Sequence, residues 1–176
     1  MKEIQAVFID RDGTIGGTGH FIHPNDFQLF DGVAEAIEKL RQAGIKIFAF
    51  TNQHRISRNQ ATKEEFAQQF KDFGFDDWFI CPHSDNDACL CKKPKPGMLL
   101  EAAQRYSLDL SKCVVIGDVG STDMLAAHAV GAMKILVKTG WGNDSLLKYR
   151  DKWAETTPDY VADDFTKAVR WIMESD

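Results

Sequence analysis

The chain has 176 residues, of which 44% are hydrophobic and 27% charged, and this is the size and composition of one globular domain. Its formal net charge of -5 argues against the basic surface that binds nucleic-acid phosphates, so we expect no nucleic acid as main partner. No apolar run approaches the roughly 20 residues that span a bilayer, and residues 1–3 lead directly into an apolar strand. We therefore expect a cytoplasmic protein without a membrane partner.

Short apolar runs alternate with helical patterns along the chain. The first run ends at Asp10, and the helical pattern after it stops at Gly44, a residue type that commonly follows the last turn of a helix. Thr62 and Glu65 have the spacing of a capping box at the start of the second helix. We expect strands at residues 4–9, 45–50, 78–80, 113–116, 133–137 and 160–162. We expect helices at residues 32–43, 62–73, 96–107, 121–130, 144–153 and 164–173.

This alternation predicts a doubly wound α/β fold in which helices cover both faces of a mostly parallel sheet. The sequence contains no linker or repeat, so we expect one domain over residues 1–176. In such sheets, ligands bind beyond the carboxyl ends of the strands. Asp10, Thr51 and Asp118 each follow a predicted strand, and the fold would bring them to that edge.

Two carboxylates, Asp10 and Asp12, stand two residues apart where the first strand ends. Burial at such a place penalises both charges, and a hard divalent cation would compensate them. Asp10 and Asp118 would each give a carboxylate oxygen to Mg²⁺. The alternative is a pair of turn-forming aspartates before Gly13, because Asp-Gly is a common turn sequence.

Three more polar residues suit a phosphate group. Thr51 and Asn52 offer a hydroxyl and free backbone N–H groups, and Lys93 offers a cation to the transferring phosphoryl group. Each has an ordinary structural interpretation as well. A threonine after a strand often caps a turn, and a lysine before a proline is often exposed to solvent.

Together these residues resemble the haloacid dehalogenase-like superfamily, whose motifs are D-x-D-G-T, a Thr or Ser after the second strand, a Lys, and G-D-x-x-x-x-D. The chain has all four in this order, at residues 10–14, Thr51, Lys93 and residues 117–123. The resemblance covers residues 4 to about 137 and implies a phosphatase with a Rossmann-like sheet. The segments on either side of the second strand have room only for loops and single helices, so we expect no cap domain.

The resemblance also implies a role for each residue. Asp10 would be the nucleophile that forms a phosphoaspartate, and Asp12 would protonate the leaving oxygen and then activate water. Thr51 and Lys93 would hold the phosphoryl group. Mg²⁺ would be bound at Asp10, the Asp12 backbone carbonyl and Asp118, with Asp123 ordering a metal-bound water or Lys93.

A second metal site is indicated by Cys81, His83, Cys89 and Cys91, spaced C-x-H-x5-C-x-C. Four such ligands close a tetrahedral Zn²⁺ site, which leaves no open position for substrate, so we expect a structural zinc that fixes the loop before Lys93. The alternative is a cysteine-rich surface loop with unrelated thiols.

This loop and the Lys92-Lys93-Pro94 sequence after it are similar to the zinc-containing subgroup of the superfamily, which acts on heptose bisphosphate and histidinol phosphate. We therefore expect a small sugar phosphate or histidinol phosphate as substrate, with contacts from Asn52, His54, Arg55 and Lys92. The subgroup usually has Arg where this chain has Lys92, and a small pair where it has His54-Arg55. An Arg grips phosphate bidentately and a Lys does not, so Arg55 or His54 would have to supply the missing contact. Solvent exposure of His54 and Arg55 is the alternative.

Other interpretations stay open at this stage. Phosphotransfer to a sugar uses the same residues, and a protein that keeps the fold but has only a weak activity would serve as a binding or structural protein. A zinc hydrolase is a third possibility. We expect a monomer or weak homodimer, and Phe21, Trp141 and Trp78 are candidates to line the cleft.

Overall fold

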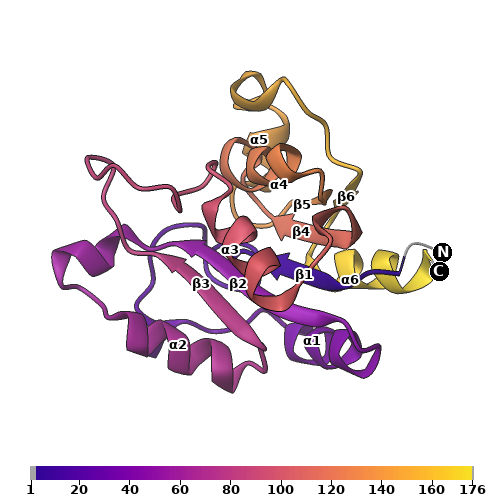
Figure 1. Cartoon of the computed structure of the whole chain (residues 1–176), viewed down its shortest axis with the longest axis horizontal. Helices are drawn as coiled ribbons and strands as arrows, with labels where there is room; N and C mark the ends of the chain where they lie inside the picture. The colour runs from indigo at the N-terminus through magenta and orange to yellow at the C-terminus, as the bar shows by residue number, and fades with distance from the viewer. Residues whose placement is uncertain (1–2, 176) are drawn as a thin grey trace.

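The computed structural model describes residues 3–175, with a six-stranded sheet in the order β3-β2-β1-β4-β5-β6 (Figure 1). Every neighbouring pair of these strands is parallel. The chain first adds strands on one side of β1 and then, from β4, on the other side. The predicted doubly wound α/β fold is therefore confirmed, and its topological switch point lies between β1 and β4. The strands are β1 (Ala6–Ile9), β2 (Lys46–Asn52), β3 (Asp77–Cys81), β4 (Cys113–Gly117), β5 (Met133–Val137) and β6 (Tyr160–Ala162).

Helices cover both faces of the sheet. The α-helices are α1 (Val33–Gln42), α2 (Lys63–Asp72), α3 (Gly97–Tyr106), α4 (Leu125–Val130), α5 (Gly142–Leu146) and α6 (Phe165–Glu174). Shorter 3-10 helices are η1 (Pro24–Asp26), η2 (His54–Arg58), η3 (Leu110–Lys112) and η5 (Arg150–Trp153), and η4 (Gly120–Met124) is a π-helical turn. The predicted capping box of α2 is present, because Thr62 and Glu65 exchange hydrogen bonds.

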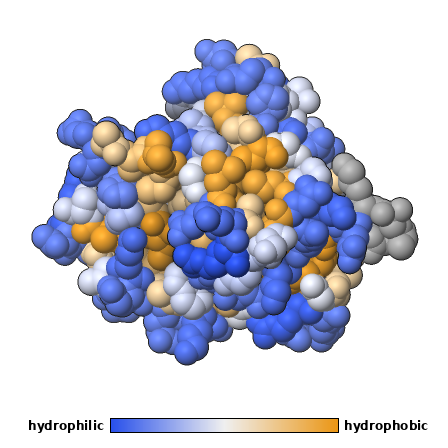
Figure 2. Space-filling view, viewed as in Figure 1, coloured by the Kyte–Doolittle hydropathy of each residue, from blue (hydrophilic) through white to orange (hydrophobic). Residues whose placement is uncertain are grey.

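Side chains of each strand alternate between two hydrophobic cores. On β1, Val7 and Ile9 face the core under α1, α2 and α6, whereas Ala6 and Phe8 face the core under α3 and α4. This two-faced burial explains why the strands read as unbroken apolar runs. The face seen in Figure 2 has hydrophilic residues around its outline and apolar residues near its centre.

Two predicted helices differ from the structure. The helix expected at residues 121–130 begins as the π-helical turn η4, in which Asp123 turns inward and its carboxylate accepts a hydrogen bond from the Val119 N–H at 3.1 Å. The helix expected at residues 144–153 is wrong, since α5 ends at Leu146 and a separate turn, η5, follows. The reversal of the chain allows the fully buried Trp153 indole to donate to the Ser145 carbonyl at 2.9 Å.

Between β1 and β2, and again between β2 and α3, the described chain holds only loops, single helices and the edge strand β3, as expected for a fold without a cap domain. Within residues 3–175 no helix is long and apolar enough to cross a membrane. The first two residues of the expected N-terminal segment and the last residue of the expected domain, residues 1, 2 and 176, lie outside the described residues.

Candidate active site

Three buried carboxylates meet at the switch point of the sheet. Asp10 directly follows β1, Asp118 follows the neighbouring β4, and Asp123 lies in η4. Oxygens of these three side chains lie within 4.8 Å of one another. The parallel register of β1 and β4 causes this meeting, because both strands end at the same edge.

Lys93 joins two of these carboxylates. Its Nζ donates hydrogen bonds to Asp10 Oδ1 at 3.0 Å, Asp123 Oδ1 at 2.7 Å and the Phe50 carbonyl at 2.9 Å. Burial would lower the pKa of Lys93, but the two carboxylates outweigh this effect and raise the pKa above its ordinary value. The ammonium group is thus a fixed positive charge at the end of the Asp10 side chain.

Asp118 is held by hydrogen-bond donors on both oxygens. Thr14 Oγ1 donates to Asp118 Oδ1 at 3.2 Å, and the Trp141 N–H donates to Oδ2 at 2.8 Å. Gly13 and Gly140, both with positive φ, leave the room for this carboxylate, since a Cβ on either would lie 2.3 or 2.2 Å from Oδ2. The glycine of the D-x-D-G-T motif therefore makes space for the aspartate of the fourth motif.

Asp12 has a different set of partners. Its Oδ1 accepts a hydrogen bond from Arg11 Nη1 at 2.6 Å, and its Oδ2 accepts one from Gln53 Nε2 at 2.7 Å. The same Gln53 nitrogen lies 2.9 Å from Thr51 Oγ1. Burial raises the pKa of Asp12 to about 6, although the Arg11 cation opposes this shift. A carboxyl group of this kind can carry a proton near neutral pH.

The donor set fits a divalent cation. Asp10, Asp12, Asp118 and Asp123 give four carboxylates, whereas Lys93 and Arg11 give two cations, so the site carries two uncompensated negative charges when all six groups are ionised. Burial and the neighbouring carboxylates raise the pKa of Asp118 well above its ordinary value. A hard dication among these oxygens would relieve that repulsion.

A cavity of about 160 Å³ opens above these groups. Its floor is made by Asp10, Asp12, Thr51 and Lys93. Its walls are Gly19, Phe21, Asn52, Gln53, His54, Arg55, Val119 and Thr122. The structure therefore brings the predicted residues Asn52, His54 and Arg55 to the cavity wall. Lys92 is not among the lining residues, and its ammonium pairs with Asp85.

Arg55 is anchored but keeps donor capacity. Its Nη1 donates to Gln60 Oε1 at 2.9 Å, and its guanidinium lies 5.4 Å from the centre of the Phe21 ring. The buried Nε has no hydrogen-bond partner. Among the described residues, the ion pairs include no carboxylate partner for Arg55.

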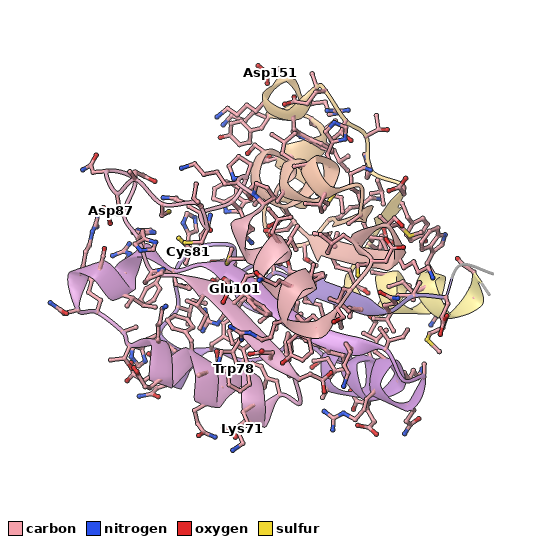
Figure 3. The ribbon with its side chains drawn as sticks, in the orientation of Figure 1. Lys71, Trp78, Cys81, Asp87, Glu101 and Asp151 are labelled. Atoms are coloured by element: carbon pink, nitrogen blue, oxygen red, sulfur yellow. The ribbon has the colours of Figure 1, made fainter. Side chains whose placement is uncertain are left out.

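The four predicted zinc ligands come together beside the cavity. His83 Nδ1 lies 3.4 Å from the Cys81 sulfur and 3.2 Å from the Cys91 sulfur, and the Cys81 and Cys89 sulfurs lie 3.8 Å apart. A tetrahedron with ordinary zinc bond lengths places two sulfurs about 3.8 Å apart and a nitrogen and a sulfur about 3.6 Å apart. The cluster therefore has the size of a closed zinc site. Figure 3 shows Cys81 where β3 leads into this loop and Asp87 farther out along it.

The loop between the cysteines and α3 is tied to the active site. Leu90 is 82% exposed, because Cys89 and Cys91 on either side of it turn toward the cluster. Two residues after Cys91, the Lys93 backbone forms a pair of hydrogen bonds with the Asn52 side chain, with N–H to Oδ1 at 3.0 Å and Nδ2 to the carbonyl at 3.2 Å. Both polar atoms of the Asn52 amide are therefore hydrogen-bonded to the Lys93 backbone.

The sequence interpretation missed Arg11, Thr14 and Gln53. Gln53 could have been found from strand alternation, because residues 51 and 53 share one side of the chain that continues β2. Two of the three aromatic candidates, Trp78 and Trp141, do not line the catalytic cavity, whereas Phe21 does. Trp78 lines a separate cavity with Glu101 at the β3 edge (Figure 3), and Trp141 lines a third cavity that shares only Val119 with the catalytic one.

Known proteins share this sequence pattern. A family model described as HAD-hydrolase-like matches residues 90–168. The D-glycero-beta-D-manno-heptose-1,7-bisphosphate 7-phosphatase of Vibrio cholerae is 39% identical over 153 aligned positions, in an alignment that covers 77% of this chain and 82% of that protein. The enzyme of the same name from Escherichia coli K12 is 34% identical over 157 aligned positions, in an alignment that covers 79% of this chain and 82% of that protein.

The fold has close counterparts among solved structures. The D,D-heptose 1,7-bisphosphate phosphatase from B. bronchiseptica, complexed with magnesium and phosphate, aligns with a TM-score of 0.80 and 27% identity. The alignment covers 98% of this chain and 99% of that one. The similarity therefore extends over the whole sheet and its connections.

Proposed function

The chain belongs to the haloacid dehalogenase-like (HAD) family and is a phosphatase of that family, and from this premise we propose that it hydrolyses a small phosphate ester through a phosphoaspartate on Asp10 in a Mg²⁺-dependent reaction. The observation that carries the proposal is the floor of the cavity. There Asp10, whose carboxylate pairs with Lys93, lies next to Asp12, whose carboxyl group has a raised pKa.

The first step transfers the phosphoryl group to the enzyme. A carboxylate oxygen of Asp10 attacks phosphorus, and the bond from phosphorus to the ester oxygen breaks. Asp12 gives its proton to that departing oxygen, so the alcohol leaves as a neutral molecule. Thr51 and Lys93 would hold the phosphoryl oxygens, and the lysine cation would stabilise their charge.

The second step returns the enzyme to its starting state. Asp12, now a carboxylate, takes a proton from a water molecule while the water oxygen attacks phosphorus. The bond between phosphorus and the Asp10 oxygen breaks, which releases inorganic phosphate and the free Asp10 carboxylate. One residue therefore serves as acid and then as base.

Asp10, Asp118 and the backbone carbonyl of Asp12 would hold Mg²⁺, with Asp123 acting on Lys93, to which it already accepts a hydrogen bond. When bound, the ion would neutralise charge on the phosphoryl oxygens. Zn²⁺ would be held by Cys81, His83, Cys89 and Cys91, and its part would be to fix the loop that carries Lys93. Cytoplasmic conditions would keep these thiols reduced.

For the substrate we propose a small sugar phosphate with a second anionic group, of the heptose bisphosphate kind named in the relatives. Arg55 supports this choice, since a cation without a carboxylate partner stands in the wall of the cavity. His54 and Asn52 lie beside it, whereas Lys92 would have to leave Asp85 to reach the ligand. One domain, as a monomer or weak homodimer, would be sufficient for this reaction.

The test is phosphate release by the purified full chain from heptose 1,7-bisphosphate, heptose 7-phosphate, histidinol phosphate, other sugar phosphates and nucleotides, each with and without Mg²⁺. We expect hydrolysis to require Mg²⁺. The value of kcat/KM should be at least about tenfold higher for the bisphosphate than for heptose 7-phosphate, which lacks only the second anionic group.

Equal rates for that pair would contradict the role of Arg55. Full activity of zinc-loaded protein without Mg²⁺ would favour a zinc hydrolase. No phosphate release from any of these substrates would favour a binding protein.

A further inference from the structure

Arg11 is a buried cation that the reaction itself does not use. It stands between Asp10 and Asp12 in the sequence, yet its side chain is fully buried and does not line the cavity. Burial of a guanidinium costs free energy, because the charge loses its hydration. Only well-placed hydrogen-bond and charge partners offset this loss. A residue of this kind in the first motif calls for a reason beyond packing.

Every nitrogen of the guanidinium has a partner. Nε donates to Gln69 Oε1 at 2.9 Å, Nη1 to Asp12 Oδ1 at 2.6 Å and Nη2 to the Ile22 carbonyl at 2.9 Å. The guanidinium carbon lies 3.8 Å from the centre of the Phe27 ring and 4.9 Å from the centre of the Phe66 ring. These contacts fix both the position and the plane of the group.

The same network holds a wall of the cavity. The Ile22 carbonyl accepts from Arg11, and Gln69 Nε2 donates to the Pro24 carbonyl at 2.7 Å. Both carbonyls belong to the loop over residues 17–27, which also contributes Gly19 and Phe21 to the cavity wall. Arg11 therefore connects α2, this loop and the Asp12 side chain.

Both oxygens of the Asp12 carboxyl group accept hydrogen bonds. Arg11 holds Oδ1 from the interior, and Gln53 holds Oδ2 at 2.7 Å. Each carboxyl oxygen has two lone pairs, so Oδ2 can carry a proton toward the cavity and still accept from Gln53. Two donors on opposite oxygens leave the carboxyl group little freedom to rotate.

We propose that Arg11 is a positioning residue that fixes the Asp12 carboxyl group and the wall formed by Gly19 and Phe21 in one arrangement, so that the ester oxygen of the substrate meets the Asp12 proton. The inference rests on the proposed role of Asp12 as the acid. It adds that the geometry of proton transfer is set from inside the core, by a residue that never touches the substrate.

Leaving-group chemistry tests this role. p-Nitrophenolate leaves without help from an acid, whereas the poorer leaving group of phenyl phosphate needs a proton more. The quantity measured is the ratio of kcat/KM for p-nitrophenyl phosphate to kcat/KM for phenyl phosphate in the Mg²⁺-loaded full chain. Arg11→Met should raise this ratio by about 10-fold to 100-fold, because general acid catalysis contributes about 10²-fold or more. The value of kcat/KM reports only events up to departure of the alcohol, so the later role of Asp12 as base does not enter.

Gln69→Met is the second variant, since it keeps the cation in place and removes only the Nε anchor and the Pro24 contact. It should shift the ratio in the same direction by about threefold or more, and it decides the matter if Arg11→Met does not fold. Asp12→Asn should raise the ratio as much as Arg11→Met or more. The control is Arg105→Met, which alters an arginine on α3 whose side chain is 48% exposed, and it should leave the ratio unchanged.

Equal losses on both esters in folded Arg11→Met or Gln69→Met would mean a purely structural role and would overturn the inference. Failure of the wild-type protein to hydrolyse either ester with Mg²⁺ would instead refute the proposed function.

Discussion

At the scale of single residues, the partners of a carboxylate decide what it can do. Asp10 and Asp12 are two residues apart, but Asp10 meets the Lys93 ammonium, while Asp12 meets a guanidinium and a neutral amide. Burial raises the pKa of Asp12 to about 6, which suits an acid that becomes a base within one turnover. The pairing with Lys93 places a positive charge beside the Asp10 carboxylate, where the phosphoryl group would be received.

Asp10→Asn should lower kcat by at least about 10³-fold with Mg²⁺ present, because an amide is neither a nucleophile nor an anionic metal ligand. Phosphate release from the preferred substrate measures the loss, and thermal melting reports whether the fold survives. The matched control is Asp151→Asn, which alters an exposed aspartate on η5, far out in Figure 3, and should leave kcat unchanged. Activity of Asp10→Asn within tenfold of wild type would rule out the phosphoaspartate on this residue.

At the scale of elements, the loop of residues 81–97 delivers the lysine. It begins at the end of β3 with Cys81, closes on itself at the four-ligand cluster and reaches α3 through Pro96. Only one residue, Lys92, separates Cys91 from Lys93, and the Asn52 amide holds the lysine backbone to the end of β2. A metal that closes the cluster would therefore also fix the position of the Lys93 ammonium.

Cys89→Ser should lower zinc content from about one ion per chain toward none, since a hydroxyl is a poor replacement for a thiolate ligand. With the loop loosened, kcat should fall by about 10²-fold, because a displacement of about 1 Å in a catalytic group has an effect of this size. Elemental analysis of the purified protein measures the metal. Cys113→Ser is the control, because this buried thiol lies outside the cluster and its loss should leave zinc content unchanged. Unaltered zinc content in Cys89→Ser would contradict the proposed ligand set.

At the scale of the whole molecule, the central strand supports both cores and the site at once. β1 lies between β2 and β4, with one core on each of its faces, and the chain passes from its last residue directly into Asp10. Phe8 is fully buried there, with its ring centre 5.3 Å from that of Phe48 and 6.3 Å from that of Phe50. Packing around Phe8 therefore supports the strand that holds the nucleophile.

Phe8→Ala should lower the free energy of unfolding by about 3 to 5 kcal/mol, through lost burial and the cavity left behind. Urea denaturation of the two proteins measures the difference. Leu147→Ala provides the control, because Leu147 is 79% exposed and its loss should change the free energy by less than about 0.5 kcal/mol. A loss below about 1 kcal/mol for Phe8→Ala would show that the neighbouring rings refill the space.

Much of the fold follows from local sequence. Unbroken apolar strands, helix caps such as that of Thr62, and glycines at helix ends are local signals, and they predict an alternating α/β chain whose polar residues gather at one sheet edge. The cysteine and histidine spacing likewise predicts one compact cluster, since its ligands are close in the chain. Sequence alone also singled out Asp10, Lys93 and Asp118.

The connections between distant residues were decided only by the tertiary structure. Arg11 reads as an ordinary motif residue until packing places its guanidinium against Gln69, 58 residues away. The helix expected at residues 144–153 breaks because burial of Trp153 against the Ser145 carbonyl outweighs local helical preference. The sequence predicts Lys92 as a substrate contact, and only the tertiary structure shows that its ammonium pairs with Asp85 and that it is not among the residues lining the cavity. Local patterns determine which helices and strands form, whereas burial and long-range hydrogen bonds determine where each side chain lies and what it contacts.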